Sequence, residues 1–307
     1  MSGRERAATI TSIAAIVLLL GTIAAWALAL PLPPLWGAHA ARIVMPPARA
    51  FDLPPVSGGV AGAADAPLVM IDAGHGGFDP GARTPTLDEK DLTLGLALAL
   101  REQLLADGGV RVAMTRSDDR FVPLTQRAEA ARRLNADLFL SIHADAAGAE
   151  NARAGQAAGA SIYTLSATAS DAAARRFAAR ENASGKVNGQ SLAGQSNAVA
   201  SILVDLSQRR TQARSERFAA LIAEAGAGRI AFHPQPRRSA ALEVLRAPDV
   251  PSVLFESGYI TNSADAARLA SGPGRAEFAR VMARAIRLYF AAERMAASPI
   301  ASSSTAP

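Results

Sequence analysis

The predicted fold rests on two stretches of the chain, LVMIDAGHGG at Leu68–Gly77 and DLFLSIHADA at Asp137–Ala146. Each is a short apolar run that ends in polar residues, which is typical of a buried strand. The first strand runs into a glycine-rich turn. A histidine directly follows each strand, His75 in the first stretch and His143 in the second. We therefore expect both histidines at strand ends.

The neighbouring segments alternate between predicted strands and predicted helices. Further strands are expected at 110–114, 159–164 and 252–255, and helices at 90–105, 127–134, 170–183, 197–225 and 278–295. Apolar strands alternating with helices imply a layered α/β sheet. Ligands of such sheets bind beyond the carboxyl ends of the strands. The site should therefore lie where the two histidines are placed.

Composition excludes several classes of function. The chain has 307 residues, of which 50% are hydrophobic and 19% charged, so a sizeable core is expected rather than global disorder. The net charge of +5 is small and dispersed, which argues against a nucleic-acid partner. The chain has no cysteine, so disulfides, cysteine zinc fingers, iron–sulfur clusters and thiol nucleophiles are excluded. Any metal must bind His, Asp or Glu.

The N-terminal region predicts export. Residues 7–30 carry no charge and would span a bilayer as a helix, so we expect 1–30 to be an uncleaved anchor in the inner membrane. Arg4 and Arg6 precede it, which places the main domain outside the cytoplasm. A cleaved signal ending near the A-H-A sequence at 38–40 is the alternative. The other expected parts are a Pro- and Gly-rich linker at 31–66, a folded domain at 67–295 and a disordered tail at 296–307.

Of the four histidines, only His75 and His143 share a setting that suggests a metal. His39 lies in the anchor or linker region, and His233 in a predicted loop beside Pro234. Either strand-end histidine alone is more often a loop or core residue than a ligand. Because both histidines lie at strand ends, a metal site is as good an interpretation of the pair as a structural role.

Two glutamates complete a candidate hydrolytic site. Glu89 stands just before the first long helix, where it would otherwise serve to complement the helix dipole. Glu256 ends an apolar strand, where the alternative role is a salt bridge to an arginine. Two histidines, one carboxylate ligand and one spare carboxylate are typical of a zinc hydrolase, in which the spare group moves the proton of the activated water. Spacing alone does not say which bond is cut.

Four segments resemble the zinc-dependent N-acetylmuramoyl-L-alanine amidases of the bacterial cell-division type. They are IDAGHGGFDPGA from Ile71, EKDLTLGLALALREQL from Glu89, the long motif from Met114 to Ala146, and APDVPSVLFESGYITN from Ala247. The resemblance covers about 67–292. It implies a twisted, mostly parallel sheet of about six strands flanked by helices. It also implies hydrolysis of the amide between the lactyl group of N-acetylmuramic acid and L-alanine in peptidoglycan.

The resemblance also assigns roles to individual residues. It places one zinc ion per chain on His75, Glu89 and His143, and the catalytic glutamate at Glu256. The segment at 166–208 resembles a helical regulatory insert, whose glutamate occupies the open position of zinc until a protein activator moves the helix. Glu181 matches that residue. The alternative is a plain surface helix on which Glu181 is solvated or paired with Arg176 or Arg180.

Three functions remain open from the sequence. The leading one is an extracytoplasmic, periplasmic peptidoglycan amidase that acts in cell separation and is autoinhibited until activated. The second is a non-catalytic peptidoglycan-binding scaffold of cell division on the same fold. The third is a zinc hydrolase of another amide or peptide.

Overall fold

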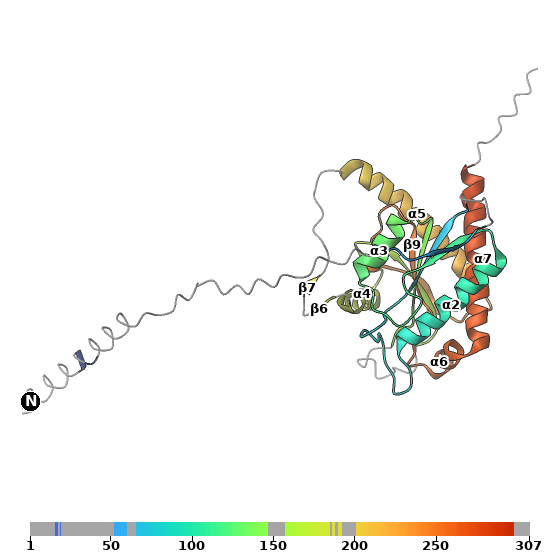
Figure 1. Cartoon of the computed structure of the whole chain (residues 1–307). Coiled ribbons are helices and arrows are strands. Elements are labelled where there is room, and N and C mark those ends of the chain that lie inside the picture. The colour runs from blue at the N-terminus through green and yellow to red at the C-terminus, as the bar shows by residue number, and fades with distance from the viewer. Residues whose placement is uncertain are drawn as a thin grey trace, which may run out of the picture. The chain divides into compact units, whose positions relative to one another are not determined.

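A mixed, mostly parallel sheet of seven strands lies at the centre of the structure (Figure 1). The computed structural model describes residues 16, 17, 19, 52–59, 66–146, 157–184, 186–187, 190–191 and 201–297, with side chains left out at 186–187, 190–191 and 201–207. The strand order is β1-β3-β2-β4-β9-β5-β8. These strands are β1 (Val56–Gly58), β2 (Leu68–Ala73), β3 (Arg111–Met114), β4 (Leu138–His143), β5 (Ala160–Leu165), β8 (Phe232–Ala240) and β9 (Ser252–Glu256).

The central strands run parallel, and this brings their carboxyl ends to one edge. β2 pairs in parallel with β3 and β4, and β4 pairs in parallel with β9. Antiparallel pairs join β1 to β3 and β5 to β9, while β5 and β8 are parallel. The predicted α/β architecture is confirmed. β6 (Lys186–Val187) and β7 (Gln190–Ser191) form a separate two-stranded ribbon.

Helices cover both faces of the sheet, and the strand residues alternate between the two. Helices α2 (Glu89–Asp107), α5 (Ser201–Gly226), α6 (Ser263–Ala270) and α7 (Gly272–Ala297) pack on one face. The other face carries α3 (Leu124–Arg133), α4 (Ala172–Ser184) and the 3₁₀ turn η2 (Glu243–Leu245). Along β2, Val69 and Ile71 point to the first layer, and Leu68 and Met70 to the second.

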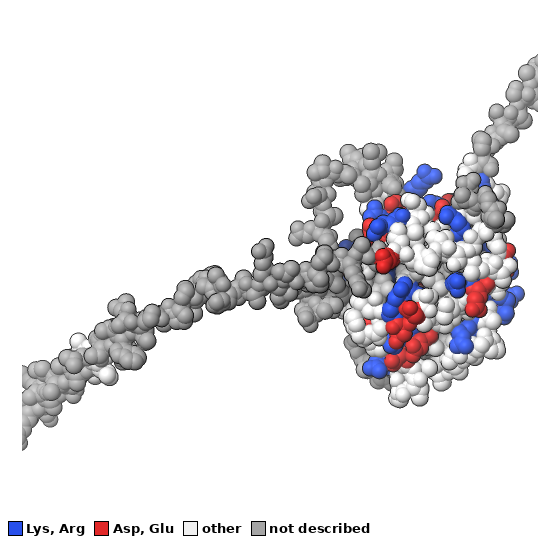
Figure 2. Space-filling model, in the orientation of Figure 1, with Lys and Arg blue, Asp and Glu red and all other residues white. Residues whose placement is uncertain are grey.

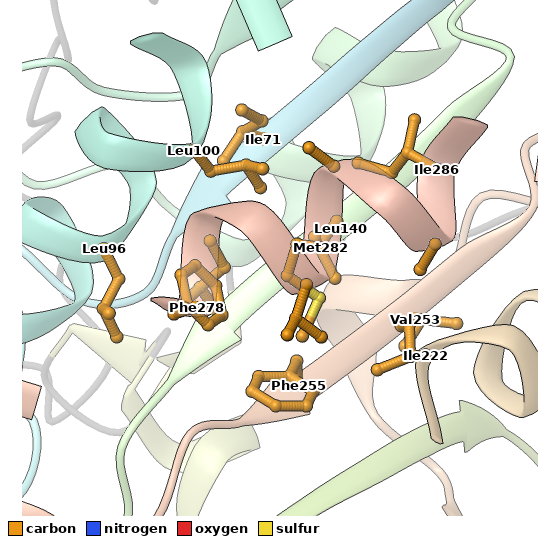
Figure 3. Packing of buried hydrophobic residues seen from close by; sticks show 14 of the residues in the cluster. Ile71, Leu96, Leu100, Leu140, Ile222, Val253, Phe255, Phe278, Met282 and Ile286 are labelled. Carbon is orange, nitrogen blue, oxygen red and sulfur yellow. The ribbon is translucent and has the colours of Figure 1, made fainter. Parts of the chain in front are cut away.

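The larger core lies under α2, α5 and α7 (Figure 3). Phe255 of β9 meets Phe278 of α7 with ring centroids 5.7 Å apart. Met282 of α7 and Ile222 of α5 are fully buried in the same cluster. Burying a side chain of this size contributes about 1.5–3 kcal/mol, so this layer holds the central strands rigidly.

Several elements differ from the sequence prediction. Residues 56–58 of the predicted linker form strand β1, and 232–240 form an edge strand instead of a loop. A loop was expected at His233 beside Pro234, but an edge strand tolerates proline because one side of its backbone needs no partner. Helix α6 was also missed; Asn262 caps it by accepting bonds from the backbone N–H groups of Ala264 and Asp265.

The chain divides into two compact units, Met1–Ala50 and Phe51–Pro307. In the first, only Ile16, Val17 and Leu19 are described; they are helical and exposed, so the predicted anchor at 1–30 lies almost wholly outside the described residues. Within the described part of the chain, no helix has the length and apolar character to cross a membrane. Helix α7 extends to Ala297, two residues into the predicted tail, and the rest of the tail is not described.

Candidate metal centre

The site residues lie at the carboxyl edge of the three central strands. His143 is the last residue of β4 and Glu256 the last of β9, and the two are direct partners in the sheet register. His75 stands two residues beyond the end of β2, and Glu89 is the first residue of α2. The parallel sheet therefore gathers residues that are far apart in sequence.

The loop that carries His75 depends on its glycines. A Cβ at Gly74 would lie 2.5 Å from the ring of His143. Gly81 has a φ of +67°, and a Cβ there would lie 2.6 Å from both Glu89 Oε2 and His75 Cδ2. His75 itself has a φ of 60°. This conformation costs energy in a non-glycine residue and persists only where the surrounding structure imposes it. The loop backbone must therefore pass close against the site.

Two buried arginines impose that conformation. Arg127 donates from Nη1 to Ala73 O and Asp72 Oδ1, and from Nη2 to His75 O, all at 2.7–2.8 Å. Arg116 donates to Ala73 O at 2.9 Å and to Gly74 O at 2.8 Å. Both guanidinium groups thus hold the backbone that follows β2, and this fixes the position of the His75 ring.

Four side-chain atoms converge on one point. Glu89 Oε1 lies 3.2 Å from His75 Nε2 and 3.2 Å from His143 Nδ1. Glu181 Oε2 of helix α4 lies 3.5 Å from His75 Nε2 and 3.2 Å from His143 Nδ1. All four side chains are buried. Such a group of nitrogen and oxygen donors has the composition of a metal site.

Two of the four converging atoms bond each other, His143 Nδ1 and Glu89 Oε1, and the other two have no partner. His75 Nε2 and Glu181 Oε2 are buried and have no hydrogen-bond partner, although they lie 3.5 Å apart. Burying a polar atom without a partner is costly. His75, His143 and Glu181 form a buried group that could hold a metal ion, since their donor atoms all lie within 4.8 Å of one another.

Two of the ligand candidates, His75 and Glu89, are oriented by further contacts. Asp79 Oδ2 bonds His75 Nδ1 at 2.9 Å, which leaves Nε2 to face the site. Glu89 Oε2 accepts from Ala82 N at 2.8 Å, and its Oε1 accepts from Ala144 N at 2.9 Å. Such contacts fix the tautomer and the ring orientation of a metal-binding histidine.

The charges of the site perturb its titration. Burial alone would raise the pKa of Glu89, but His75 and His143 outweigh it and hold that pKa well below its ordinary value. Burial also opposes protonation of His75, yet Glu89 and Asp79 raise the pKa of His75 well above its usual range. The carboxylates of Glu89 and Asp79 therefore favour a positive charge where the side-chain atoms converge.

Glu256 lies beside this group and differs from it electrostatically. Its Oε2 accepts from Asp145 N at 2.9 Å, and its Oε1 is buried without a hydrogen-bond partner. Burial, followed by the charges of Asp145, Glu89 and Glu181, raises the pKa of Glu256 well above its ordinary value. Glu256 is therefore suited to accept a proton.

Helix α4 is fixed on both sides of Glu181. Arg180 donates to Asp145 Oδ1 at 2.6 Å and to Oδ2 at 2.5 Å. Asn182 Nδ2 donates to Ala241 O at 2.8 Å, and its Oδ1 accepts from Glu243 N at 2.8 Å. The residues before and after Glu181 thus hold its carboxylate over the histidines.

Comparison with known proteins identifies the family of the chain. The Amidase_3 family model, described as N-acetylmuramoyl-L-alanine amidase, matches residues 69–287. The chain belongs to this amidase family. It is 35% identical to N-acetylmuramoyl-L-alanine amidase AmiC of Escherichia coli O6:H1 over 80% of its own length and 57% of that protein. It is 37% identical to AmiA of Salmonella typhimurium, over 73% of this chain and 76% of the relative.

Solved structures show the same fold in other family members. AmiC2 of Nostoc punctiforme aligns with 74% of this chain and 98% of its own, at 28% identity and a TM-score of 0.51. The catalytic domain of CwlV from Bacillus (Paenibacillus) polymyxa aligns with a TM-score of 0.51 at 24% identity, which supports the fold alone. The chain spans 57% and 52% of the length of the two AmiC relatives, from Escherichia coli and Neisseria meningitidis.

In this amidase-family chain, the five residues predicted from sequence lie together. His75, Glu89, His143 and Glu181 surround one point, and Glu256 pairs with His143 across the sheet. The alternative role of Glu256, a salt bridge to an arginine, finds no support among the described residues. Glu256 Oε1 has no hydrogen-bond partner, so it is not satisfied by an arginine.

The alternatives for the two helix glutamates have different outcomes. Glu89 lies in the first turn of α2, where it also complements the helix dipole, and the N-cap is Asp88. Arg180 pairs with Asp145, not with Glu181. His233, expected in a loop, lies in β8, where its Nδ1 accepts from Gln235 N at 3.1 Å.

Sequence reasoning missed the residues that support the site. Asp79 lies four residues after His75, and this spacing across a tight turn was the available signal. Arg116 and Arg127 gave no such signal. All but two of the 32 basic residues are arginines, and most arginines are expected on the surface, so the sequence does not distinguish the two that are buried. Their burial depends on the backbone carbonyls of Ala73, Gly74 and His75, at the end of β2 and in the loop that follows it.

Proposed function

We propose that this chain is a zinc-dependent amidase that cleaves the bond between N-acetylmuramic acid and L-alanine in peptidoglycan. The single observation that carries the proposal is the convergence of His75, Glu89 and His143 beside the unpartnered oxygen of Glu256. Family membership supplies the substrate class. The proposal includes an extracytoplasmic location with an N-terminal anchor, which the uncharged segment at 7–30 supports.

The donor set fits zinc. A tetrahedral ion with ligands at about 2.0–2.2 Å would place the ligand atoms roughly 3.3–3.6 Å apart. The four separations between the histidine nitrogens and the glutamate oxygens, 3.2, 3.2, 3.2 and 3.5 Å, are close to this spacing. Two histidines and a carboxylate are a usual ligand set of hydrolytic zinc sites. His75, Glu89 and His143 would hold the ion.

The chain's own residues supply the proton transfers. Bound zinc supplies Lewis acidity, which lowers the pKa of a bound water and polarises the amide carbonyl. Glu256 Oε1 takes a proton from the attacking water, as its raised proton affinity allows. The same carboxyl then gives the proton to the amine of L-alanine as the C–N bond breaks. The backbone N–H of Asp145 keeps Glu256 in place through Oε2.

We further propose that the described conformation is an autoinhibited one. A catalytic zinc site keeps one position open, whereas Glu181 here completes a closed set of four protein donors. Arg180 and Asn182 tie its helix down. A protein activator that binds α4 better in a displaced position would expose the site. Activation at the division site would couple the enzyme to cell separation.

The test measures zinc content and product on the same sample of the full chain. Elemental analysis should give one zinc per chain. Isolated peptidoglycan should release stem peptides with free L-alanine amino termini, detected by mass spectrometry, and a chelator should abolish release. Glu181→Ala should raise the basal rate, while Glu102→Ala, at an exposed position of α2, should not.

The outcomes separate the candidate functions. Zinc without release in either the wild type or Glu181→Ala would contradict the amidase proposal and favour a non-catalytic scaffold. An equal rate of stem-peptide release by the wild type and Glu181→Ala would confirm the amidase and contradict autoinhibition. Cleavage of free peptides in preference to peptidoglycan would point to another amide as the substrate.

A further inference from the structure

A buried hydroxyl without a hydrogen-bond partner lies on strand β5. On the face of the molecule that Figure 2 shows, side chains of opposite charge lie next to one another. In contrast, Ser161 of β5 is 2% exposed, and its Oγ has no hydrogen-bond partner among the described residues. Most buried polar side-chain atoms in proteins are bonded, so an exception calls for an explanation.

The sheet register places Ser161 beside Glu256. Ser161 is opposite Glu256 of β9, and Glu256 is in turn the register partner of His143 on β4. Opposed residues of an antiparallel pair have their side chains on the same face, with Cβ atoms about 4.5–5.5 Å apart. His143, Glu256 and Ser161 therefore form one row across three neighbouring strands. Ser257 also has a buried hydroxyl without a partner, but it lies beyond the end of β9 and outside this row.

The carboxylate of Glu256 is held at only one of its two oxygens. Oε2 accepts from the backbone N–H of Asp145 at 2.9 Å, while Oε1 has no hydrogen-bond partner among the described residues. The terminal torsion of a glutamate is broad, so one bond at Oε2 leaves the carboxylate free to turn. A donor at Oε1 would fix the plane of the group.

The small size of serine does not by itself explain its presence in the row. Tyr163, two residues after Ser161 on the same face of β5, stacks on Phe177 of helix α4 with ring centroids 4.5 Å apart. If Ser161 served only to make room for α4, alanine would fit equally well and would bury no polar atom. The hydroxyl itself therefore needs a function.

We propose that Ser161 is a positioning residue for Glu256, and that its hydroxyl donates a hydrogen bond to Oε1 during turnover. This inference rests on the proposed amidase function and on the role of Glu256 in it. A carboxylate oxygen has two lone pairs, so Oε1 can accept from Ser161 and still face the attacking water. The bond is not made in the described conformation. Hydrogen bonds of catalytic groups are often long or poorly aligned until the substrate is bound, and a serine hydroxyl can turn among three staggered rotamers.

The experiment measures kcat and KM of Ser161→Ala in the full chain. The substrate is soluble N-acetylmuramoyl-tripeptide, with initial rates on isolated peptidoglycan measured beside it, in the wild-type and Glu181→Ala chains. Loss of a bond made only during turnover should lower kcat about tenfold and leave KM unchanged. Zinc content should stay at the wild-type value. The melting temperature should not fall, because Ser161 Oγ has no bond to lose in the described conformation.

Matched variants separate positioning from packing. Ser161→Thr keeps the hydroxyl and should keep kcat within about threefold of the wild type. Ser252→Ala, at the other end of β9, removes a buried hydroxyl that donates to Val250 O at 2.7 Å, so it should lower the melting temperature and leave kcat unchanged. In the Glu256→Gln chain, Ser161→Ala should lower the residual rate no further, because a positioning residue acts through Glu256.

Three results would overturn the inference. An unchanged kcat in Ser161→Ala would show that the hydroxyl does not act in turnover. A lower kcat accompanied by zinc loss or a lower melting temperature would assign Ser161 a structural role instead. A raised KM with unchanged kcat would indicate a contact with bound substrate rather than with Glu256.

Failure of the inference differs from failure of the proposed function. If neither the wild type nor Glu181→Ala hydrolyses the soluble substrate or isolated peptidoglycan, the amidase proposal fails and the inference fails with it. If either chain is active and Ser161→Ala matches its rate, the amidase stands and Ser161 is excluded as a positioning residue.

Discussion

Two buried clusters of charged and polar groups lie at the carboxyl ends of the same strands, and they differ in how their atoms are satisfied. The first, here called the scaffold cluster, consists of Asp72, Thr115, Arg116, Arg127 and Ser141. Asp72 Oδ1 accepts from Thr115 at 2.6 Å and from Arg127 at 2.8 Å, and Oδ2 accepts from Ser141 at 2.6 Å. In this cluster both carboxylate oxygens have donors.

The second, the metal cluster, consists of His75, Glu89, His143, Glu181 and Glu256. Here His75 Nε2, Glu181 Oε2 and Glu256 Oε1 lack hydrogen-bond partners. Both clusters are almost fully buried. Buried polar groups whose hydrogen bonds are all made stabilise a single conformation. Buried polar atoms without hydrogen-bond partners remain able to bind a ligand or take part in a reaction. The difference shows which charges serve structure and which serve chemistry.

The largest expected effect is the loss of turnover in Glu256→Gln. Glutamine keeps the shape of the side chain but cannot take the proton, so the release of L-alanine termini should fall about 10²- to 10⁴-fold. Zinc content should stay at the wild-type value, and the melting temperature should not fall, because a buried charge is removed. Mass spectrometry of the released peptides measures turnover, and elemental analysis measures zinc content. Retention of more than a tenth of the activity would remove Glu256 from the mechanism.

Arg127→Met in the scaffold cluster should, in contrast, lower the stability of the fold. The variant leaves Asp72 buried without its ion pair, which should cost about 3–5 kcal/mol of unfolding free energy in urea titrations. Asp72→Asn in the same chain should restore part of this loss. A destabilisation below about 1 kcal/mol would show that the cluster is not what holds the strand end.

The scaffold cluster also predicts a pH dependence. Burial would raise the pKa of Asp72, but Arg127, Ser141 and Thr115 outweigh it and lower that pKa below 3.8. A depressed folded pKa stabilises the protein above the unfolded value and loses this contribution as pH falls through the folded value. In Arg127→Met the burial is no longer opposed by the arginine, so the pKa of Asp72 rises above 3.8 and the variant protonates before the wild type does. The stability difference between wild type and Arg127→Met should therefore shrink as pH falls, beginning above pH 3.8, in chelator-treated samples.

The two clusters also differ in what the sequence allowed us to predict. His143 and Glu256 end apolar strands and His75 lies two residues beyond one, and parallel strands must place their ends together, so local pattern and topology indicated that the three lie close to one another. The α/β class followed from the same alternation. A hydrolytic zinc site with Glu89 as a candidate ligand was already an open interpretation of the residues, and the family resemblance then assigned the ligands and the role of Glu181. A mid-helix glutamate carries no local signal of metal binding.

The rest depended on tertiary contacts. Strand β8 contains prolines and arginines and is a strand only because β5 offers its edge. Arg116 and Arg127 are buried because carbonyl groups at 73–75 need donors, and one arginine among many exposed ones cannot be distinguished in advance. The pairing of Arg180 with Asp145 joins positions 35 residues apart across a segment that includes undescribed residues.

A smaller effect is expected where a bonded residue supports the metal cluster. Asp79→Ala removes the acceptor for His75 Nδ1 and should weaken zinc affinity about 10- to 100-fold, measured by competition with a chelator. Asp79→Asn keeps an acceptor without the charge and should lie between Ala and the wild type. Asp118→Ala, at an exposed position in the loop after β3, is the control. Equal affinity in all chains would show that the ring is held by packing alone.

The smallest expected effect concerns the tethers of helix α4. Arg180→Ala removes an ion pair whose arginine is 47% exposed, so solvent screening limits its contribution to about 1 kcal/mol, or roughly a fivefold rise in basal amidase activity. The rise should be smaller than that of Glu181→Ala, because the carboxylate remains near the histidines. Arg176→Ala, at an exposed position one turn earlier in the same helix, should change nothing. If Arg180→Ala and Arg176→Ala have the same basal rate, the ion pair with Asp145 does not hold α4 over the metal cluster, and the contacts of Asn182 must do so alone.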